Sequence, residues 1–139
     1  MKISILNSPN HSAKSRIKNN IKFIVIHYTG MQSERACIRR LTSKSSQVST
    51  HYLINRKGSI IRMVDEKKTA WHAGKSKWKN LTNLNSQSIG IELVNKGHQF
   101  GYENFSKKQI TNLILLCLEL VKKYKIKKKI LLATQTSLL

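Results

Sequence analysis

The sequence predicts a single α/β domain, and three features of its 139 residues carry that prediction. Residues 21–29 and 88–95 hold runs of β-branched and other apolar residues typical of strands that are buried on both faces. Residues 51–54 and 59–64 are two further strand-like runs. Residues 106–124 carry apolar side chains at the 3.6-residue spacing of a long helix. With 40% hydrophobic residues, a chain of this length has room for one core.

The N-terminal part of the chain shows no periodic pattern, so residues 1–20 are expected to form an irregular arm with a local turn at Ser8–Asn10. After the first strand, Ser33 is placed to cap a short helix that runs to about Thr42. The spacing of its apolar residues predicts that three of them face inward, namely Cys37, Ile38 and Leu41.

The middle of the chain predicts a hairpin followed by a long irregular segment. The runs at 51–54 and 59–64 are joined by Asn55–Gly58, whose Asn and Gly suit a tight turn, so the two strands are expected to pair antiparallel. Residues 65–87 are polar and aperiodic. An irregular segment of this length inside a compact domain is more often functional than passive, and we expect it to wall a cleft.

The C-terminal third predicts a strand, a helix and a short last strand. A capping box at Ser106–Gln109 starts the long helix, and Ile130–Leu132 opens the last strand. No helix or strand is predicted for residues 133–139, which are interpreted as an aberrant tail. The inward face of the helix is predicted to consist of its periodic apolar residues, which are Ile110, Leu113, Ile114, Cys117, Leu118, Val121 and Tyr124.

The charge of the chain favours anionic partners, because 26 Lys and Arg residues against six acidic residues give a net charge of +20. The lysines are scattered, and the aromatic residues do not interleave with them, which argues against a dedicated nucleic-acid function. No apolar run reaches the roughly 20 residues of a membrane span, and the apolar part of the N-terminus is too short for a secretory signal. The expected location is therefore cytoplasmic.

Two titratable residues stand out because each lies in an apolar strand. His27 comes at the end of the run that starts at Phe23, and Glu92 lies in the middle of residues 88–95. A lone histidine in such a place is more often an ordinary core residue. An unpaired carboxylate there would cost several kcal/mol, so Glu92 needs a cation, a metal or a donor nearby. Together the two residues favour a functional site.

Five segments then occur in the order and rough spacing of a known protein family: His27–Gly30, Ser49–Ile54, Trp71–Gly74, Asn85 and Ser88–Asn95. Over roughly residues 21–132 the chain resembles the zinc-dependent N-acetylmuramoyl-L-alanine amidases of the type 2 amidase fold, which is shared with phage amidase lysozymes and peptidoglycan recognition proteins. The resemblance implies a single mixed β-sheet flanked by helices. It also implies hydrolysis of the amide between the lactyl group of muramic acid and L-alanine, in peptidoglycan or muropeptides.

The resemblance implies a role for each of five residues. His27 is the expected zinc ligand, Glu92 the catalytic carboxylate, and Trp71, His72 and Asn85 the expected substrate-binding residues. The alternatives are a hydrophobic plug for Trp71 and a loop hydrogen bond for His72. A zinc ion with three protein ligands and one open position lowers the pKa of bound water to about 7. A nearby carboxylate can take the proton of that water and pass it to the leaving amine.

The chain departs from the family after the long helix, where the family carries its second His ligand, its third ligand and a catalytic Lys. The second ligand lies in a Gly-His-Ser-Asp-Ile-Ala-Pro string that follows the last strand, and the chain shows Ala133–Leu139 instead. Each codon junction from Leu132 to Leu139 can encode the matching residue of that string. We therefore interpret the tail as this string in a shifted reading frame; a divergent natural tail is the alternative, and the nucleotide sequence distinguishes them.

The leading hypothesis from the sequence is therefore an N-acetylmuramoyl-L-alanine amidase that is C-terminally truncated. It is expected to be a monomer, to bind zinc weakly and to be impaired as an enzyme, with peptidoglycan or muropeptide fragments as its partners. Two alternatives belong to other classes. One is a non-catalytic peptidoglycan-binding protein, and the other is a basic nucleic-acid-binding protein, which the net charge alone suggests.

Overall fold

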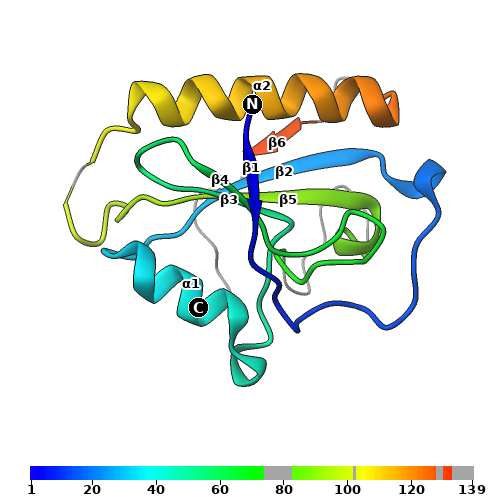
Figure 1. The fold of residues 1–139 in the computed structure, drawn as a ribbon, viewed down its shortest axis with the longest axis horizontal. Coiled ribbons are helices and arrows are strands. Elements are labelled where there is room, and N and C mark those ends of the chain that lie inside the picture. The colour runs from blue at the N-terminus through cyan, green and yellow to red at the C-terminus, as the bar shows by residue number, and fades with distance from the viewer. Residues whose placement is uncertain (74–82, 102, 128–129, 133–139) are drawn as a thin grey trace.

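The computed structural model describes residues 1–73, 83–101, 103–127 and 130–132. Its strands are β1 (Ile3–Ile5), β2 (Phe23–Tyr28), β3 (Tyr52–Ile54), β4 (Ile60–Arg62), β5 (Ser88–Leu93) and β6 (Ile130–Leu132), and its helices are α1 (Glu34–Thr42) and α2 (Lys107–Tyr124). The strands form one sheet in the order β1-β4-β3-β5-β2-β6, with α1 and α2 on opposite sides (Figure 1). Only β3 and β4 pair antiparallel. The predicted mixed sheet and the predicted hairpin are both confirmed.

Alternation along the two central strands divides the core between the two helices. Ile24 and Ile26 of β2, with Ile89 and Ile91 of β5, belong to the cluster that packs against α2. Successive side chains of a strand point to opposite faces, so the residues that alternate with these four lie on the other face of the sheet, the side on which α1 lies. His27, directly after Ile26, is on this side. The chemistry-bearing face of the sheet is therefore the α1 face.

Helix α1 forms as the sequence predicts. The hydroxyl of Ser33 accepts a hydrogen bond from the backbone N–H of Ala36 at 3.1 Å, which caps the helix. Cys37 and Leu41 are buried, and Ile38 is partly buried. They pack on Leu53, Met63 and Val94, which fixes the helix over β3 and β5.

Helix α2 begins at the predicted place, but only half of the predicted capping box is present. Ser106 Oγ accepts from the backbone N–H of Gln109 at 3.1 Å. The side chain of Gln109 does not turn back to the cap, as a capping box requires. It is buried, and its Nε2 donates to the carbonyl oxygens of Ile54 at 3.1 Å and Val94 at 3.0 Å. Gln109 thus ties the helix to the ends of β3 and β5.

The inward face of α2 is also rotated from the predicted one. Leu116 and Leu120 are buried, whereas Ile114 is 53% exposed and Leu118 is 62% exposed, so the prediction was wrong for these last two. The physical reason is that the buried face of the helix begins with Gln109. Because glutamine is polar, a search for periodic apolar residues does not assign it to the buried face. In the part of the chain that is described, no helix is both long and apolar enough to cross a membrane.

Replacing Gln109 by Leu is expected to lower the free energy of unfolding by about 2 kcal/mol, because two buried hydrogen bonds of about 1 kcal/mol each are lost at nearly constant volume. Urea denaturation measures this change. The same substitution at the exposed Gln99 serves as the control and is expected to stay within about 0.5 kcal/mol. Equal effects at both positions would contradict the anchoring role.

The N-terminal arm is part of the domain, and the expectation of an irregular segment was wrong at Ile3–Ile5. These residues form β1, which pairs parallel with β4 at the edge of the sheet. Two of its three residues are exposed, so its sequence carries no alternation signal. Further on, the buried Asn10 donates from Nδ2 to the carbonyl oxygens of Ser43 at 2.7 Å and Val48 at 2.9 Å. These bonds fix the arm beneath the C-terminal end of α1.

Candidate active site

His27 and Glu92 are direct neighbours on the two central strands. They occupy the same register position of the parallel pair β2 and β5, so their side chains leave the same face of the sheet. His27 is 4% exposed and Glu92 is 1% exposed. His72 covers the ring of His27, and Glu92 lies under α1 beside Cys37 and Arg40. The fold therefore places the two residues that the sequence singled out on neighbouring strands and on one face of the sheet.

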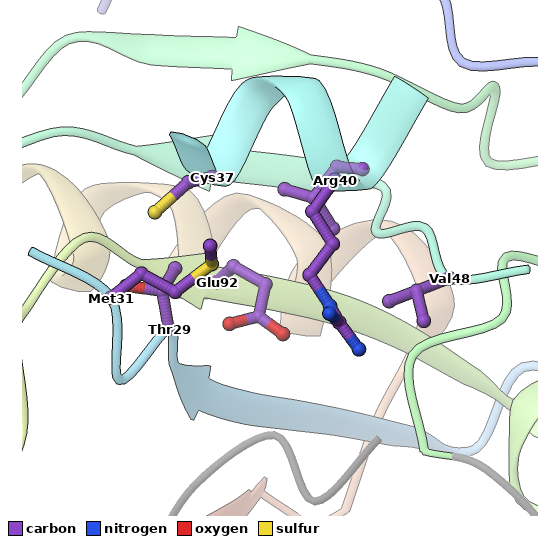
Figure 2. A pocket seen from close by; sticks show the side chains of 7 residues that line it. Thr29, Met31, Cys37, Arg40, Val48 and Glu92 are labelled. Atoms are coloured by element: carbon purple, nitrogen blue, oxygen red, sulfur yellow. The ribbon is translucent and has the colours of Figure 1, made fainter. Parts of the chain in front are cut away.

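Glu92 faces a small pocket under α1. The pocket has a volume of about 10 Å³, and it is lined by Thr29, Met31, Cys37 and Arg40, with Leu41 and Val48. Figure 2 shows the carboxylate of Glu92 and the guanidinium of Arg40 directed into this space. A volume of this size holds about one water molecule. Glu92 thus lies against a confined space beside Arg40.

His27 makes one ring contact with another histidine. Its Nε2 lies 3.0 Å from Nδ1 of His72, and the two rings meet edge to face. Its Nδ1 has no hydrogen-bond partner among the residues that the structure describes. Burial lowers the pKa of His27 to about 4, so the ring is neutral at pH 7. A neutral imidazole with an unused nitrogen is a suitable metal ligand.

His72 is 0% exposed, and the surrounding chain fixes it on several sides. Its Nε2 lies 3.0 Å from Ser88 Oγ. Its backbone N–H and that of Ala73 donate to Asn85 Oδ1 at 3.2 and 2.9 Å. Its ring lies on Gly90, where an added Cβ would come within 2.4 Å of the ring carbons Cγ and Cδ2. Burial, followed by the neighbouring histidines, holds the pKa of His72 well below its usual value.

The structure shows what each of the three predicted substrate-binding residues contacts within the protein. His72 and Asn85 make contacts within the protein, and Trp71 is half-buried with its backbone N–H donating to Ser49 Oγ at 2.9 Å. Their role toward substrate stays a prediction. Trp78, also expected in the wall of a cleft, lies outside the described residues.

A third histidine lies beyond His72, and no sequence signal pointed to its partners. Nδ1 of His51 accepts from the backbone N–H of Gly90 at 3.0 Å, and its Nε2 lies 2.9 Å from the carbonyl oxygen of Lys68. Arg16 lies against the same nitrogen at 3.1 Å and donates to the carbonyl oxygen of Ser88 at 2.7 Å. Burial, then the charge of Arg16, lowers the pKa of His51 to about 3. Both ring nitrogens of His51 are therefore used inside the protein.

The residues present fit one position of a zinc site but not a complete one. A zinc site requires at least three protein ligands. Every His, Cys, Asp and Glu of the sequence falls within the described residues, and among these no group of three or more could hold a metal ion. The unused Nδ1 of His27 fits a single ligand position.

Comparison with known proteins places the chain in a family. Residues 17–135 match the family described as N-acetylmuramoyl-L-alanine amidase. The chain belongs to this amidase family. AmiD, an N-acetylmuramoyl-L-alanine amidase from Escherichia coli K12, is 41% identical over 119 residues, which cover 77% of this chain and 42% of AmiD. The 1,6-anhydro-N-acetylmuramyl-L-alanine amidase AmpD from Haemophilus influenzae is 38% identical over 71 residues, which cover 50% of this chain and 39% of AmpD.

The chain thus spans about two fifths of the length of these curated relatives. Solved structures of the amidase family share the fold over a larger part. A crystal structure of AmpD has a TM-score of 0.79 at 24% identity, covering 94% of this chain and 80% of AmpD. Escherichia coli AmiD in complex with the substrate anhydro-N-acetylmuramic acid-L-Ala-D-γ-Glu-L-Lys has a TM-score of 0.67 at 36% identity, covering 88% of this chain and 50% of AmiD. The predicted fold class is confirmed.

Proposed function

We propose that this chain is an N-acetylmuramoyl-L-alanine amidase module whose substrate is the amide between the muramic acid lactyl group and L-alanine in peptidoglycan or muropeptides. The observation that carries the proposal is the placement of His27 and Glu92 at one register position of two buried strands. Membership of the amidase family supports it. So does AmiD, whose structure contains an anhydromuramyl peptide described as its substrate.

The side chain that moves protons in this proposal is Glu92. Amide hydrolysis requires a water to lose a proton and the leaving amine to gain one. Glu92 faces a space for about one water and can do both in turn. The amine released is the α-amino group of L-alanine. The resemblance to zinc amidases adds His27 as a metal ligand, but the described residues leave the other ligand positions without candidates, so no step is derived through the metal.

That incomplete ligand set favours a second function, which is peptidoglycan binding without turnover. Such binding uses the fold of the amidase family and does not need a metal. The two functions differ in whether Glu92 matters, because binding alone has no proton to move. The cytoplasmic location and the monomeric state expected from the sequence stay predictions.

Product analysis and retention on peptidoglycan separate the two functions. The chain is incubated with anhydro-N-acetylmuramic acid-L-Ala-D-γ-Glu-L-Lys, and free peptide is measured by mass spectrometry, beside Glu92→Gln as the matched variant. Release of peptide that Glu92→Gln abolishes supports the amidase. Retention on insoluble peptidoglycan without release supports the binding function. Steeply salt-dependent retention on DNA with no affinity for peptidoglycan overturns both.

The zinc content of the purified chain is expected to be well below one atom per molecule. One imidazole supplies only a small part of the free energy that a three-ligand site gives to bound zinc. The measurement is elemental analysis of protein prepared without a histidine tag and dialysed after loading with zinc, with Escherichia coli AmiD treated in parallel. The His27→Ala variant is expected to change the result little. Stoichiometric zinc that His27→Ala removes would show that the ligand set is complete after all.

A further inference from the structure

Four groups behind the candidate site form one row of hydrogen bonds. Nε2 of His27 contacts Nδ1 of His72 at 3.0 Å, Nε2 of His72 contacts Ser88 Oγ at 3.0 Å, and Ser88 Oγ donates to the carbonyl oxygen of Leu84 at 2.7 Å. His72 and Ser88 have no exposed surface, and His27 and Leu84 are also buried. Water therefore cannot replace any of these partners. The row must satisfy itself with the protons that its members carry.

The far end of the row sets the direction of every bond. A carbonyl oxygen only accepts, so the single hydroxyl proton of Ser88 is committed to Leu84. Ser88 Oγ must then accept from His72, which places the proton of that ring on Nε2. Nδ1 of His72 is left with a lone pair and accepts from His27, which places the His27 proton on Nε2 as well. The remaining Nδ1 of His27 carries a lone pair.

This direction requires both rings to be neutral, and their surroundings favour that state. Both rings are buried, so an imidazolium in either position would lose its hydration, which costs free energy. Two adjacent imidazolium rings would also repel each other.

We propose that His72 is a positioning residue that holds His27 as its Nε2–H tautomer and so keeps the Nδ1 lone pair of His27 available to a ligand. Histidines that bind metals in proteins commonly have their second ring nitrogen fixed by such a partner. The use of Nδ1 by a metal or substrate rests on the proposed function, whereas the tautomer does not. His72 thus acts through His27, which it contacts at Nε2.

The fold holds His72 in place for this role. Gly90 leaves room for the ring directly on the sheet, where any larger residue would meet it. Asn85 accepts the backbone N–H groups of His72 and Ala73, which fixes the direction from which the side chain enters. The ring of His72 therefore has little freedom to turn. Its Nδ1 stays in place as the acceptor of the hydrogen bond from Nε2 of His27, which fixes the His27 tautomer.

Nitrogen NMR of the histidine rings tests the proposal directly. In long-range ¹H–¹⁵N spectra of the metal-free chain at pH 7.5, both rings are expected as single Nε2–H tautomers, with the His27 signals assigned by their loss in His27→Gln. His72→Asn keeps an acceptor near the position of Nδ1 and is expected to preserve the His27 tautomer. His72→Phe removes the acceptor and is expected to give a mixture of both tautomers. An Nδ1–H tautomer of His27 in the native chain would overturn the proposal, as would an unchanged tautomer in His72→Phe.

A matched pair of serine variants keeps the test decisive if His72→Phe does not fold. Ser88→Ala removes the acceptor of His72, so a mixture of tautomers is expected in both rings. Ser8→Ala removes another buried hydroxyl that donates to a carbonyl oxygen, that of Leu41, and is expected to change neither ring. Unchanged tautomers in Ser88→Ala would contradict the row. Because the readout is a ring proton, failure of amidase activity leaves the test intact.

Discussion

Lowering the pH from 7 to 5 is expected to reduce the free energy of unfolding by about 4 kcal/mol or more, through two buried histidines and a further contribution from a third. Burial lowers the pKa of His27 to about 4, that of His51 to about 3 and that of His72 well below 6.5. Below pH 6.5 the unfolded chain binds protons at these positions and the folded chain does not. His27 and His51 therefore each cost about 2 kcal/mol at pH 5, and His72 adds to this loss. A loss of this size is comparable to the whole stability of many small domains.

The buried carboxylate of Glu66 responds at lower pH, so its effect can be separated from that of the histidines. Burial alone would raise the pKa of Glu66, but hydrogen bonds from Lys123, Tyr124 and Tyr52 outweigh it and hold that pKa below 4.5. The stabilisation from Glu66 is complete above pH 4.5 and is lost only as the pH falls through its folded pKa. The interval from pH 6.5 to 5 thus reports on the histidines.

Urea denaturation in EDTA at several pH values between 7.5 and 5 measures this dependence. His51→Gln is expected to remove about 2 kcal/mol of the loss, whatever its effect on stability at pH 7.5. A free energy of unfolding that stays constant down to pH 5 would show that the buried rings accept protons in the folded state.

The sequence identified His27 and Glu92 because each interrupts an apolar run, and interruption is visible without coordinates. Their pairing at one register position needed the sheet order, which brings β2 beside β5 across more than 60 residues of chain. The role of His72 had no such signal. Its segment is polar and aperiodic, and its importance comes from contacts with Ser88 and Gly90 that only the fold creates.

The two errors in the predicted fold also come from contacts between residues that are distant in the sequence. The inner face of α2 was misassigned because Gln109 is polar yet buried, and its two acceptors belong to strands 15 and 55 residues away. Strand β1 was missed because three residues at a sheet edge are too few to show a period. Local patterns predicted the elements themselves. The orientation of one element against another depends on polar residues whose partners are distant in the sequence, and local patterns contain no information on such partners.

Replacing Gly90 by Ala is expected to lower the free energy of unfolding by about 3 kcal/mol, although the change adds one methyl group. The new Cβ would lie 2.4 Å from two ring carbons of His72 and 2.9 Å from its Nδ1. The ring cannot move aside, because it is fully buried and bonded to His27 and Ser88. Gly90 lies in β5 with no positive φ, so backbone strain does not contribute. Urea denaturation at pH 7.5 gives the size of the loss.

A double variant shows whether the clash with His72 is the cause. His72→Ala removes the ring and leaves a cavity, so Gly90→Ala in that background is expected to be neutral or stabilising. The coupling between the two substitutions is then expected to reach about 2 kcal/mol or more, as for residues in direct contact. Additive effects would mean that Gly90 is required for some other reason. Strong coupling would show that the clash with His72 causes the loss of stability. If Gly90→Ala also gives a mixture of His27 tautomers, the absence of a side chain at position 90 is required for the protonation pattern of the candidate active site.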